Sequence, residues 1–227
     1  MINGLSVAVI IPALNEEKAI GRVLEDLPSW VDEVIVVDNG STDRTAEVAR
    51  KHQARVVSEP IRGYGQACYT GVAHACGADI LVFIDADYSD YPDEAARLVA
   101  PIAEDRSDFV VGSRVRGSHA RGSLTLQQRF GNWLACRLIA SFWGYRYTDL
   151  GPFRAIRAST LRALCLQDRG YGWTTEMQIR AVQKGYRILE VPVSYRPRIG
   201  RSKISGTVRG VVGAGFKILL TIFRCLR

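Results

Sequence analysis

The stretch DILVFIDADYSDYPDE, residues 79–94, decides the fold class of this chain. Its first half is a short, continuous apolar run, which is typical of a strand buried on both faces of a parallel sheet. The run ends directly in Asp85 and Asp87, and further acidic residues follow up to Glu94. Crowded carboxylates repel one another and raise each other's pKa. We therefore expect either a positive group among them or a turn that leads them into water.

Short apolar runs alternate with helix-period stretches on both sides of this segment. Strands are predicted at residues 5–11, 33–37, 54–57, 79–84 and 108–112. Helices are predicted at residues 16–27, 43–52, 65–76 and 92–104. This alternation indicates an α/β fold with a Rossmann-like, mostly parallel sheet covered by helices on both faces. Farther along, the pattern indicates a helix at 130–143 and a helix–strand pair across 174–195.

Composition excludes several other classes of protein. The chain has 227 residues, of which 47% are hydrophobic, and this is enough for one large core. No run reaches the roughly 18–20 apolar residues of a membrane span, and the N-terminus reads as a first strand, not as a signal peptide. The five cysteines form no CxxC pair, which indicates a reduced, cytoplasmic protein without a zinc framework. The net charge of +7 comes without a nucleic-acid-binding motif, so no nucleic-acid partner is expected.

Polar residues stand where three of the predicted strands end. These ends are residues 12–16, residues 38–41 and residues 85–87. Ligands bind at the carboxyl ends of strands in open parallel sheets, so the three ends predict one site. The chain has no GxGxxG fingerprint and no P-loop, so a divalent cation is the expected partner of any bound diphosphate. Asp85 and Asp87 can both present oxygens to a hard cation such as Mg²⁺ or Mn²⁺.

Several motifs occur in order along roughly nine-tenths of the chain, which is more specific than any one of them. They are VIIPALNEE, VVDNGSTDRT, DADYSDYPDE, VGSR, TDLGPFRAI and EMQIRAVQKGYRILEVPVSYRPRIGRSKISG. With these motifs the chain resembles a family 2 glycosyltransferase of the GT-A fold. Among its members the chain is most similar to polyprenyl-phosphate sugar synthases, such as dolichyl-phosphate mannose or glucose synthases, without their C-terminal membrane spans.

The resemblance implies a nucleotide-diphosphate sugar as donor and a role for individual residues. The implied nucleotide-sugar-binding residues are Pro12, Ala13, Glu16, Asp38, Asn39, Gly65, Asp85 and Ala86. Asp85 and Asp87 would be the DxD pair that holds Mg²⁺ or Mn²⁺ with the diphosphate. Asn39 can offer a donor and an acceptor to a uracil edge, which favours a UDP-sugar, with GDP-mannose as the alternative.

An inverting transfer needs different protein groups for a hydroxyl acceptor and for a phosphate acceptor. A hydroxyl acceptor needs a carboxylate as general base, for which Glu176 and Asp149 are the candidates. A polyprenyl phosphate is already anionic and needs cations instead. By resemblance, these cations would be Arg114, Arg129, Arg201 and Lys203. The implied catalytic residues are then Asp87, Glu176, Asp149 and Arg201, and a non-catalytic subunit that binds nucleotide sugar is a third alternative.

The domain organisation follows from the same likeness. Residues 1–206 are expected to form one GT-A domain, with a nucleotide-sugar-binding half at 1–113 and an acceptor half at 114–206. Residues 207–227 are predicted to form an amphipathic helix. On a helical wheel its four basic residues share one sector, which suits either the headgroup boundary of a membrane or a helix packed on the core or on a second copy. Contact with a membrane would make this a peripheral protein on the cytoplasmic membrane face. Packing on a second copy would make it a homo-oligomer.

Overall fold

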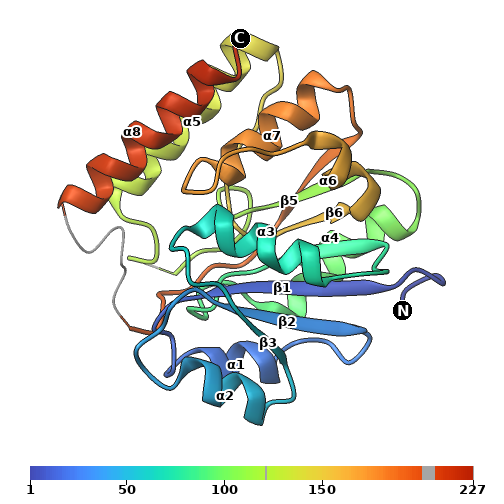
Figure 1. The fold of residues 1–227 in the computed structure, drawn as a ribbon. Coiled ribbons are helices and arrows are strands. Elements are labelled where there is room, and N and C mark those ends of the chain that lie inside the picture. The colour runs from blue at the N-terminus through green and yellow to red at the C-terminus, as the bar shows by residue number, and fades with distance from the viewer. Residues whose placement is uncertain (121, 201–207, 227) are drawn as a thin grey trace.

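A computed structural model of the protein describes residues 1–120, 122–200 and 208–226, and its centre is a seven-stranded sheet with helices on both faces (Figure 1). The strand order is β3-β2-β1-β4-β6-β5-β7. The strands are β1 (Val7–Ala13), β2 (Glu33–Asp38), β3 (Arg55–Ser58), β4 (Ile80–Phe83), β5 (Phe109–Ser113), β6 (Arg154–Arg157) and β7 (Ile188–Pro192). The mixed α/β architecture with a mostly parallel sheet confirms the predicted fold class.

Strand β6 is antiparallel to both of its neighbours, β4 and β5, while the other pairings are parallel. It begins within the TDLGPFRAI motif and was not predicted as a strand. Its first residue, Arg154, is charged and yet fully buried, so the apolar run that marks the other strands is absent here. Because β1, β2 and β4 are parallel neighbours, their carboxyl ends meet at one edge of the sheet.

The helices form two layers, one on each face of the sheet. They are α1 (Ile20–Glu25), α2 (Thr45–Lys51), α3 (Tyr64–His74), α4 (Ala95–Ala103), α5 (Leu126–Trp143), α6 (Ala158–Leu164), α7 (Trp173–Gln183) and α8 (Val208–Arg224), with a 3₁₀ turn at Pro92–Glu94. Side chains of β1 alternate between the layers. Val7 and Val9 pack with α1, α2 and α4, while Ala8 and Ile10 pack with α3, α5, α6 and α7.

Two helix starts differ from the prediction. The helix predicted from residue 16 begins only at Ile20, because Asn15 has a left-handed φ of 52° and the backbone N–H of Glu16 donates to Thr45 Oγ1. The helix predicted from residue 130 begins at Leu126. There Thr125 caps the helix, and Thr125 and Gln128 form a reciprocal capping box. Helix α6 was not predicted.

Helix α8 lies beside α5 at the edge of the molecule (Figure 1). Ile222 is fully buried against the core, whereas Phe216 and Phe223 are 66% and 52% exposed. Lys217, one of the four basic residues predicted to share one sector of this helix, pairs with Asp168 at 3.0 Å. The side chains of Arg209 and Arg227 lie outside the described residues. Among the described helices none is both long and apolar enough to cross a bilayer.

Candidate active site

A cavity of about 390 Å³ opens at the carboxyl edge of the sheet. Its walls come from the ends of β1 and β4, the start of α3 and the arm that follows β7. The lining includes Pro12, Ala13, Glu16, Asn39, Asp85, Ala86 and Asp87, all of which the sequence predicted for the donor site, and also Leu14, Arg62, Gly63, Tyr64, Ala67, Tyr171 and Arg198. The predicted residues Asp38 and Gly65 lie next to this lining and are not part of it.

Gly65 has a packing role at the start of α3. A Cβ placed there would lie 2.6 Å from the carbonyl oxygen of Asp168, so the helix start and the loop before α7 could not approach as they do. The backbone N–H of Gly65 donates to the carbonyl of Gly170 at 3.2 Å. Asp38 ends β2, and its Oδ1 accepts from the backbone N–H of Ser41. Both residues therefore shape the loops around the cavity.

Asn39 is 5% exposed and ties the loop after β3 to the cavity wall. Its Nδ2 donates to the carbonyls of Glu59 and Ile61 at 2.9 and 2.8 Å. Its Oδ1 accepts from the backbone N–H of Gly63 at 2.8 Å. Both amide hydrogens are thus used within the protein. The expectation that this amide offers a donor to a uracil edge is wrong for the structure as it stands, because the loop takes that donor.

Asp85 and Asp87 have the chemistry of a divalent-cation site. One oxygen of Asp85, Oδ1, is buried without a hydrogen-bond partner. Burial, and then the neighbouring charge of Asp87, raises the pKa of the Asp85 carboxyl to about 7. An orphaned carboxylate oxygen beside a second carboxylate fits a hard cation. Among the described residues no cluster of three or more His, Cys, Asp or Glu side chains forms a metal site, so the remaining ligands would be diphosphate oxygens and water.

Arg198 is the positive group that lies among these carboxylates. Its Nη2 is 2.7 Å from Oε1 of Glu16, and its Nη1 is 3.2 Å from Oδ2 of Asp87. The arm that carries it is fixed to the loop after β4, because the N–H of Ile199 donates to the carbonyl of Asp87 at 3.0 Å. Arg198 lies in the last of the motifs quoted above, and the sequence gave it no place at the donor site.

A second cavity, of about 820 Å³, forms a cleft along α5. The lining comprises Arg114, Val115, His119, Leu124, Gln128, Arg129, Asn132, Trp133, Cys136, Arg137, Ala140, Ser141, Arg146, Tyr147, Thr148 and Asp149. On α5 this set runs from Gln128 to Ser141, a length of about 20 Å at 1.5 Å per residue. Arg114 and Arg129 were predicted to bind an acceptor phosphate. Arg137 and Arg146 were not predicted. We refer to this cavity as the arginine cleft.

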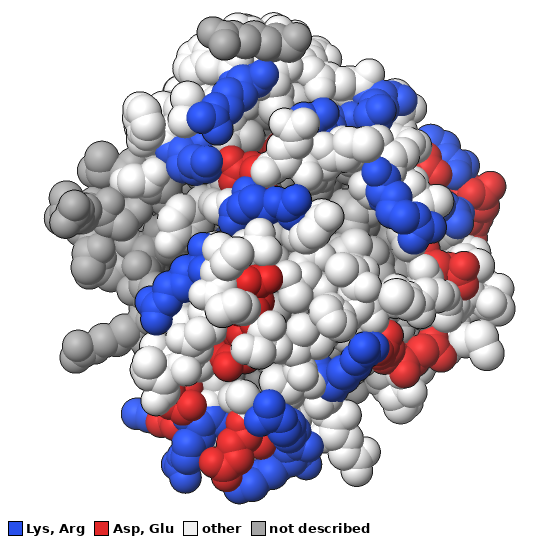
Figure 2. Space-filling view, viewed as in Figure 1, with Lys and Arg blue, Asp and Glu red and all other residues white. Residues whose placement is uncertain are grey.

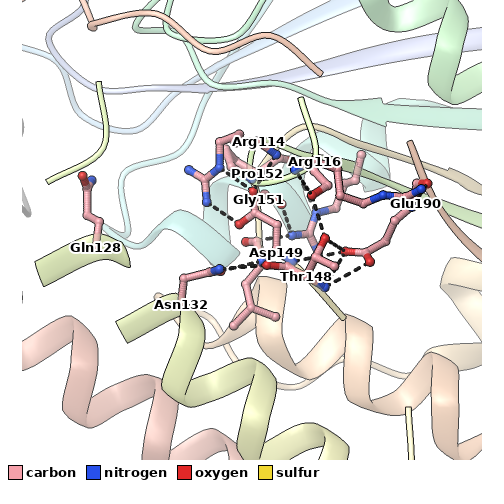
Figure 3. A network of polar contacts seen from close by, with 12 residues as sticks. Arg114, Arg116, Gln128, Asn132, Thr148, Asp149, Gly151, Pro152 and Glu190 are labelled. Atoms are coloured by element: carbon pink, nitrogen blue, oxygen red, sulfur yellow. Dashed lines mark hydrogen bonds and ion pairs between the residues drawn. The ribbon is translucent and has the colours of Figure 1, made fainter. Parts of the chain in front are cut away.

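Asp149 holds Arg114 in a fixed position at the end of the arginine cleft (Figure 3). Its oxygens accept from Nε and Nη2 of Arg114 at 2.8 and 2.7 Å and from the Arg114 backbone N–H at 2.8 Å. Burial disfavours the charge on Arg114, but the charge and hydrogen bonds of Asp149 outweigh it and raise the guanidinium pKa. Asp149 is 1% exposed, and Glu190 accepts from its backbone N–H at 3.1 Å. Both oxygens of Asp149 are thus engaged by Arg114, so the geometry does not support the predicted role of Asp149 as a base.

Glu176, the other predicted base, lines neither cavity. Its side chain is 4% exposed, and Oε2 accepts from the backbone N–H groups of Gln167 and Asp168 at 2.9 and 2.7 Å. Its Oε1 pairs with Nε of Arg180 at 2.7 Å. The first two contacts hold the loop before α7 and the third lies within α7, so the geometry does not support Glu176 as a base. The predicted residues Arg201 and Lys203 lie outside the described residues.

Charged residues that line one cavity act on the pKa of carboxyl groups in and near the other. The positive charges of Arg198 and Arg114 both favour the ionised form of Asp85, although burial and Asp87 outweigh them. Asp90 is 1% exposed, and the charges of both Asp85 and Arg114 act on the pKa of its carboxyl, in opposite directions. Burial, and then the charge of Asp85, raises the pKa of the Asp90 carboxyl well above its ordinary value. Arg114 of the arginine cleft is thus close enough to Asp85 of the first cavity for its charge to act on that carboxyl.

The mostly parallel sheet, with a cavity at the carboxyl ends of its strands, is typical of an α/β enzyme. The model of the family "Glycosyl transferase family 2" matches residues 8–164, and the chain belongs to this family. The protein is accordingly a glycosyltransferase of the GT-A fold. Family membership disfavours the alternative of a non-catalytic binding subunit.

Related proteins and structures are similar over most of the chain. An uncharacterized glycosyltransferase of Mycobacterium tuberculosis is 37% identical over 92% of this chain and 94% of its own length. A dolichyl-phosphate hexose transferase of Haloferax volcanii is 36% identical over 87% of this chain and 86% of its own length. The crystal structure of glucosyl-3-phosphoglycerate synthase from M. tuberculosis with Mn²⁺, UDP-glucose and phosphoglyceric acid has a TM-score of 0.79 at 27% identity and covers 98% of this chain and 80% of that one.

Proposed function

We propose that this glycosyltransferase moves a sugar from a UDP-sugar to a polyprenyl phosphate, with inversion at the sugar carbon and with Mg²⁺ or Mn²⁺ as cofactor. The proposal rests on two cavities of the structure. One contains Glu16, Asp85 and Asp87 and would bind the donor, and the other is the arginine cleft. The UDP-glucose and Mn²⁺ in the structurally similar synthase support the donor and the metal. The dolichyl-phosphate relative supports the acceptor.

Each cavity would bind one anionic substrate. Asp85 and Asp87 would hold the divalent cation, which neutralises the diphosphate as it leaves. A phosphate monoester loses its second proton near pH 6, so at neutral pH its oxygen is already a nucleophile. Arg114, held in place by Asp149, and the exposed Arg129 would bind that phosphate.

The contacts of the two candidate bases, Asp149 and Glu176, favour a phosphate over a hydroxyl as the acceptor. A hydroxyl nucleophile needs a carboxylate that can take a proton. Asp149 is paired with Arg114 through both oxygens, and Glu176 is enclosed by three donors away from both cavities. A phosphate acceptor requires neither of them as a base.

A transfer assay with three acceptors tests this proposal. The acceptors are a short polyprenyl phosphate, the corresponding polyprenol and phosphoglyceric acid, each supplied with UDP-glucose and Mn²⁺. We expect transfer to the polyprenyl phosphate, reduced about tenfold or more in Arg129→Ala, because a charge-assisted contact contributes about 1.5–3 kcal/mol. Arg50→Ala, which removes an exposed arginine on α2, is the matched control. Transfer to the polyprenol alone would overturn the proposal, and so would transfer to phosphoglyceric acid alone, because that acceptor is water-soluble and also offers a hydroxyl.

A lipid acceptor requires a membrane, and the charge distribution supports a contact with an anionic one. Residues 109–148 and 191–227 contain 6 and 8 Lys or Arg residues, 14 in total, and no Asp or Glu. The rest of the chain has 30 − 14 = 16 basic and 23 acidic residues, a net charge of −7. The two acid-free segments contain α5 and α8, which pack together. Figure 2 shows basic side chains and few acidic ones over the part of the molecule where α8 lies.

The same two helices expose large apolar side chains. Phe130 and Trp133 of α5 are 62% and 55% exposed, and Phe216 and Phe223 of α8 are similarly exposed. Aromatic side chains among basic ones suit the headgroup boundary of an anionic bilayer. We expect the protein to float with vesicles that contain phosphatidylglycerol, and the double change Phe216→Ser with Phe223→Ser to abolish this. Ile61→Ser, which removes an exposed apolar residue elsewhere, should not. Wild-type protein that stays unbound would refute the contact.

A further inference from the structure

Asp87 has one oxygen left for a cation, and Arg198 occupies it. Oδ1 of Asp87 accepts from the backbone N–H of Ser89 at 2.9 Å and from Ser89 Oγ at 2.5 Å. Oδ2 lies 3.2 Å from Nη1 of Arg198. Asp87 is 7% exposed, so its carboxylate has little access to bulk water. Any cation that binds between Asp85 and Asp87 therefore competes with this guanidinium for Oδ2.

Arg198 is also placed to contact the donor once its guanidinium no longer pairs with Asp87. It lines the same cavity as Asp85 and Asp87, and its Nε is buried without a hydrogen-bond partner. Its other contact, from Nη2 to Glu16, keeps it at the cavity wall. A guanidinium is a good partner for diphosphate oxygens, because its several N–H groups can donate to two of them at once.

We propose that Arg198 is an exchangeable counter-cation of the donor site, which neutralises Asp87 in the empty cavity and moves to the donor diphosphate when a divalent cation takes Asp87. This deepens the proposed function and rests on it. Arg198 then makes the binding of metal alone unfavourable and the joint binding of metal and nucleotide favourable.

The proposal predicts opposite effects of one substitution on two binding constants. In Arg198→Gln the competitor is lost, so Mn²⁺ alone should bind about tenfold more tightly. At saturating Mn²⁺ the wild-type Arg198 has already left Asp87, so UDP affinity then reports its contact with the diphosphate. This affinity should fall about tenfold in Arg198→Gln, which is the lower end of the effect of a charge-assisted hydrogen bond. A structural role alone would weaken both constants together.

Free Mn²⁺ measured by electron paramagnetic resonance gives the first constant, and calorimetric titration with UDP gives the second. Arg62→Gln is the control, since Arg62 lines the same cavity and its Nη2 donates to the carbonyl of Gly40, not to a carboxylate. It should change Mn²⁺ affinity less than twofold. In an Asp87→Asn background, Arg198→Gln should no longer tighten Mn²⁺ binding, because the contested oxygen has lost its charge.

The outcomes separate this inference from the proposed function. Unchanged or weaker binding of Mn²⁺ alone to Arg198→Gln overturns the counter-cation role, even if wild-type protein binds UDP in a metal-dependent way. Equal tightening in Arg62→Gln also overturns it, since the effect would then reflect the general loss of a positive charge. Wild-type protein that binds no UDP with Mn²⁺ overturns both proposals.

Discussion

The change Glu176→Gln distinguishes a structural carboxylate from a catalytic base. The wild-type side chain accepts two backbone N–H groups, from Gln167 and Asp168, through Oε2, and pairs with Arg180 through Oε1. Glutamine keeps one carbonyl oxygen for the loop and places an NH₂ group opposite Arg180. The loop hydrogen bonds then lose their charge assistance, and Arg180, 28% exposed, can turn to water.

The expected cost follows from these contacts. A hydrogen bond to a charged group contributes about 1.5–3 kcal/mol and a neutral one about 0.5–1.5, so two weakened bonds cost about 2 kcal/mol. The partly exposed ion pair adds at most about 1 kcal/mol. A protein of this size loses about 2–4 °C of Tm per kcal/mol, so we expect a decrease in Tm of roughly 5–10 °C.

Calorimetry and steady-state kinetics on the same samples complete the test. Below the lowered Tm, kcat for polyprenyl phosphate should change less than about threefold, and the pH profile should keep its shape, since a structural carboxylate leaves the chemical step intact. Arg180→Gln, which removes only the ion pair, should lower Tm by less than Glu176→Gln. A hundredfold loss of kcat at an unchanged Tm, together with the loss of an acid limb from the pH profile, would refute this reasoning and restore Glu176 as the base.

Three further predictions concern other parts of the structure. Thr125→Ala should cost about 1 kcal/mol in urea unfolding through loss of the α5 cap, whereas Thr125→Ser should be nearly neutral. Asn39→Ala should lower UDP affinity about tenfold or more, because it releases the loop from Glu59 to Gly63. The three hydrogen bonds that Asn39 makes with this loop contribute about 1 kcal/mol each. An unchanged affinity in calorimetric titration would contradict this. The carbonyl of Val48, and then Glu25, raise the pKa of His52 above 6.5. Wild type should therefore have a higher Tm than His52→Gln below pH 6.5, and this difference should disappear as the pH rises through the higher pKa of His52 in the folded state. Thermal melts across pH 5–9 would check this.

The strand ends could be predicted because local pattern and sheet geometry agree there. Val- and Ile-rich runs mark buried parallel strands, and the residues that follow such strands meet at one edge whatever the loop details. For this reason the sequence predicted Pro12, Glu16, Asp85 and Asp87, and the structure brings all of them into one cavity.

Other residues depend on contacts that have no local signal. Arg198 meets Glu16 across 182 positions of sequence, and no pattern links the two. Arg137 and Arg146 look like ordinary surface charges until α5 is placed beside the loop after β5. Glu176 stands at a position that suits a base, but the loop eight and nine residues before it folds back and encloses its carboxylate.

In the proposed mechanism, Asp85 and Asp87 form a metal-dependent site for a nucleotide-diphosphate sugar. Calorimetric titration with UDP-glucose, in Mn²⁺ or in EDTA, on wild type and Asp87→Ala tests it most directly, with GDP-mannose as the comparison donor. We predict that Mn²⁺ tightens UDP-glucose binding to wild type at least tenfold, since a carboxylate–metal–diphosphate bridge replaces repulsion between like charges. Asp87→Ala should stay folded and show no gain from Mn²⁺. An equal gain in the Asp87→Ala protein, or equally tight binding to wild type in EDTA, would contradict the claim.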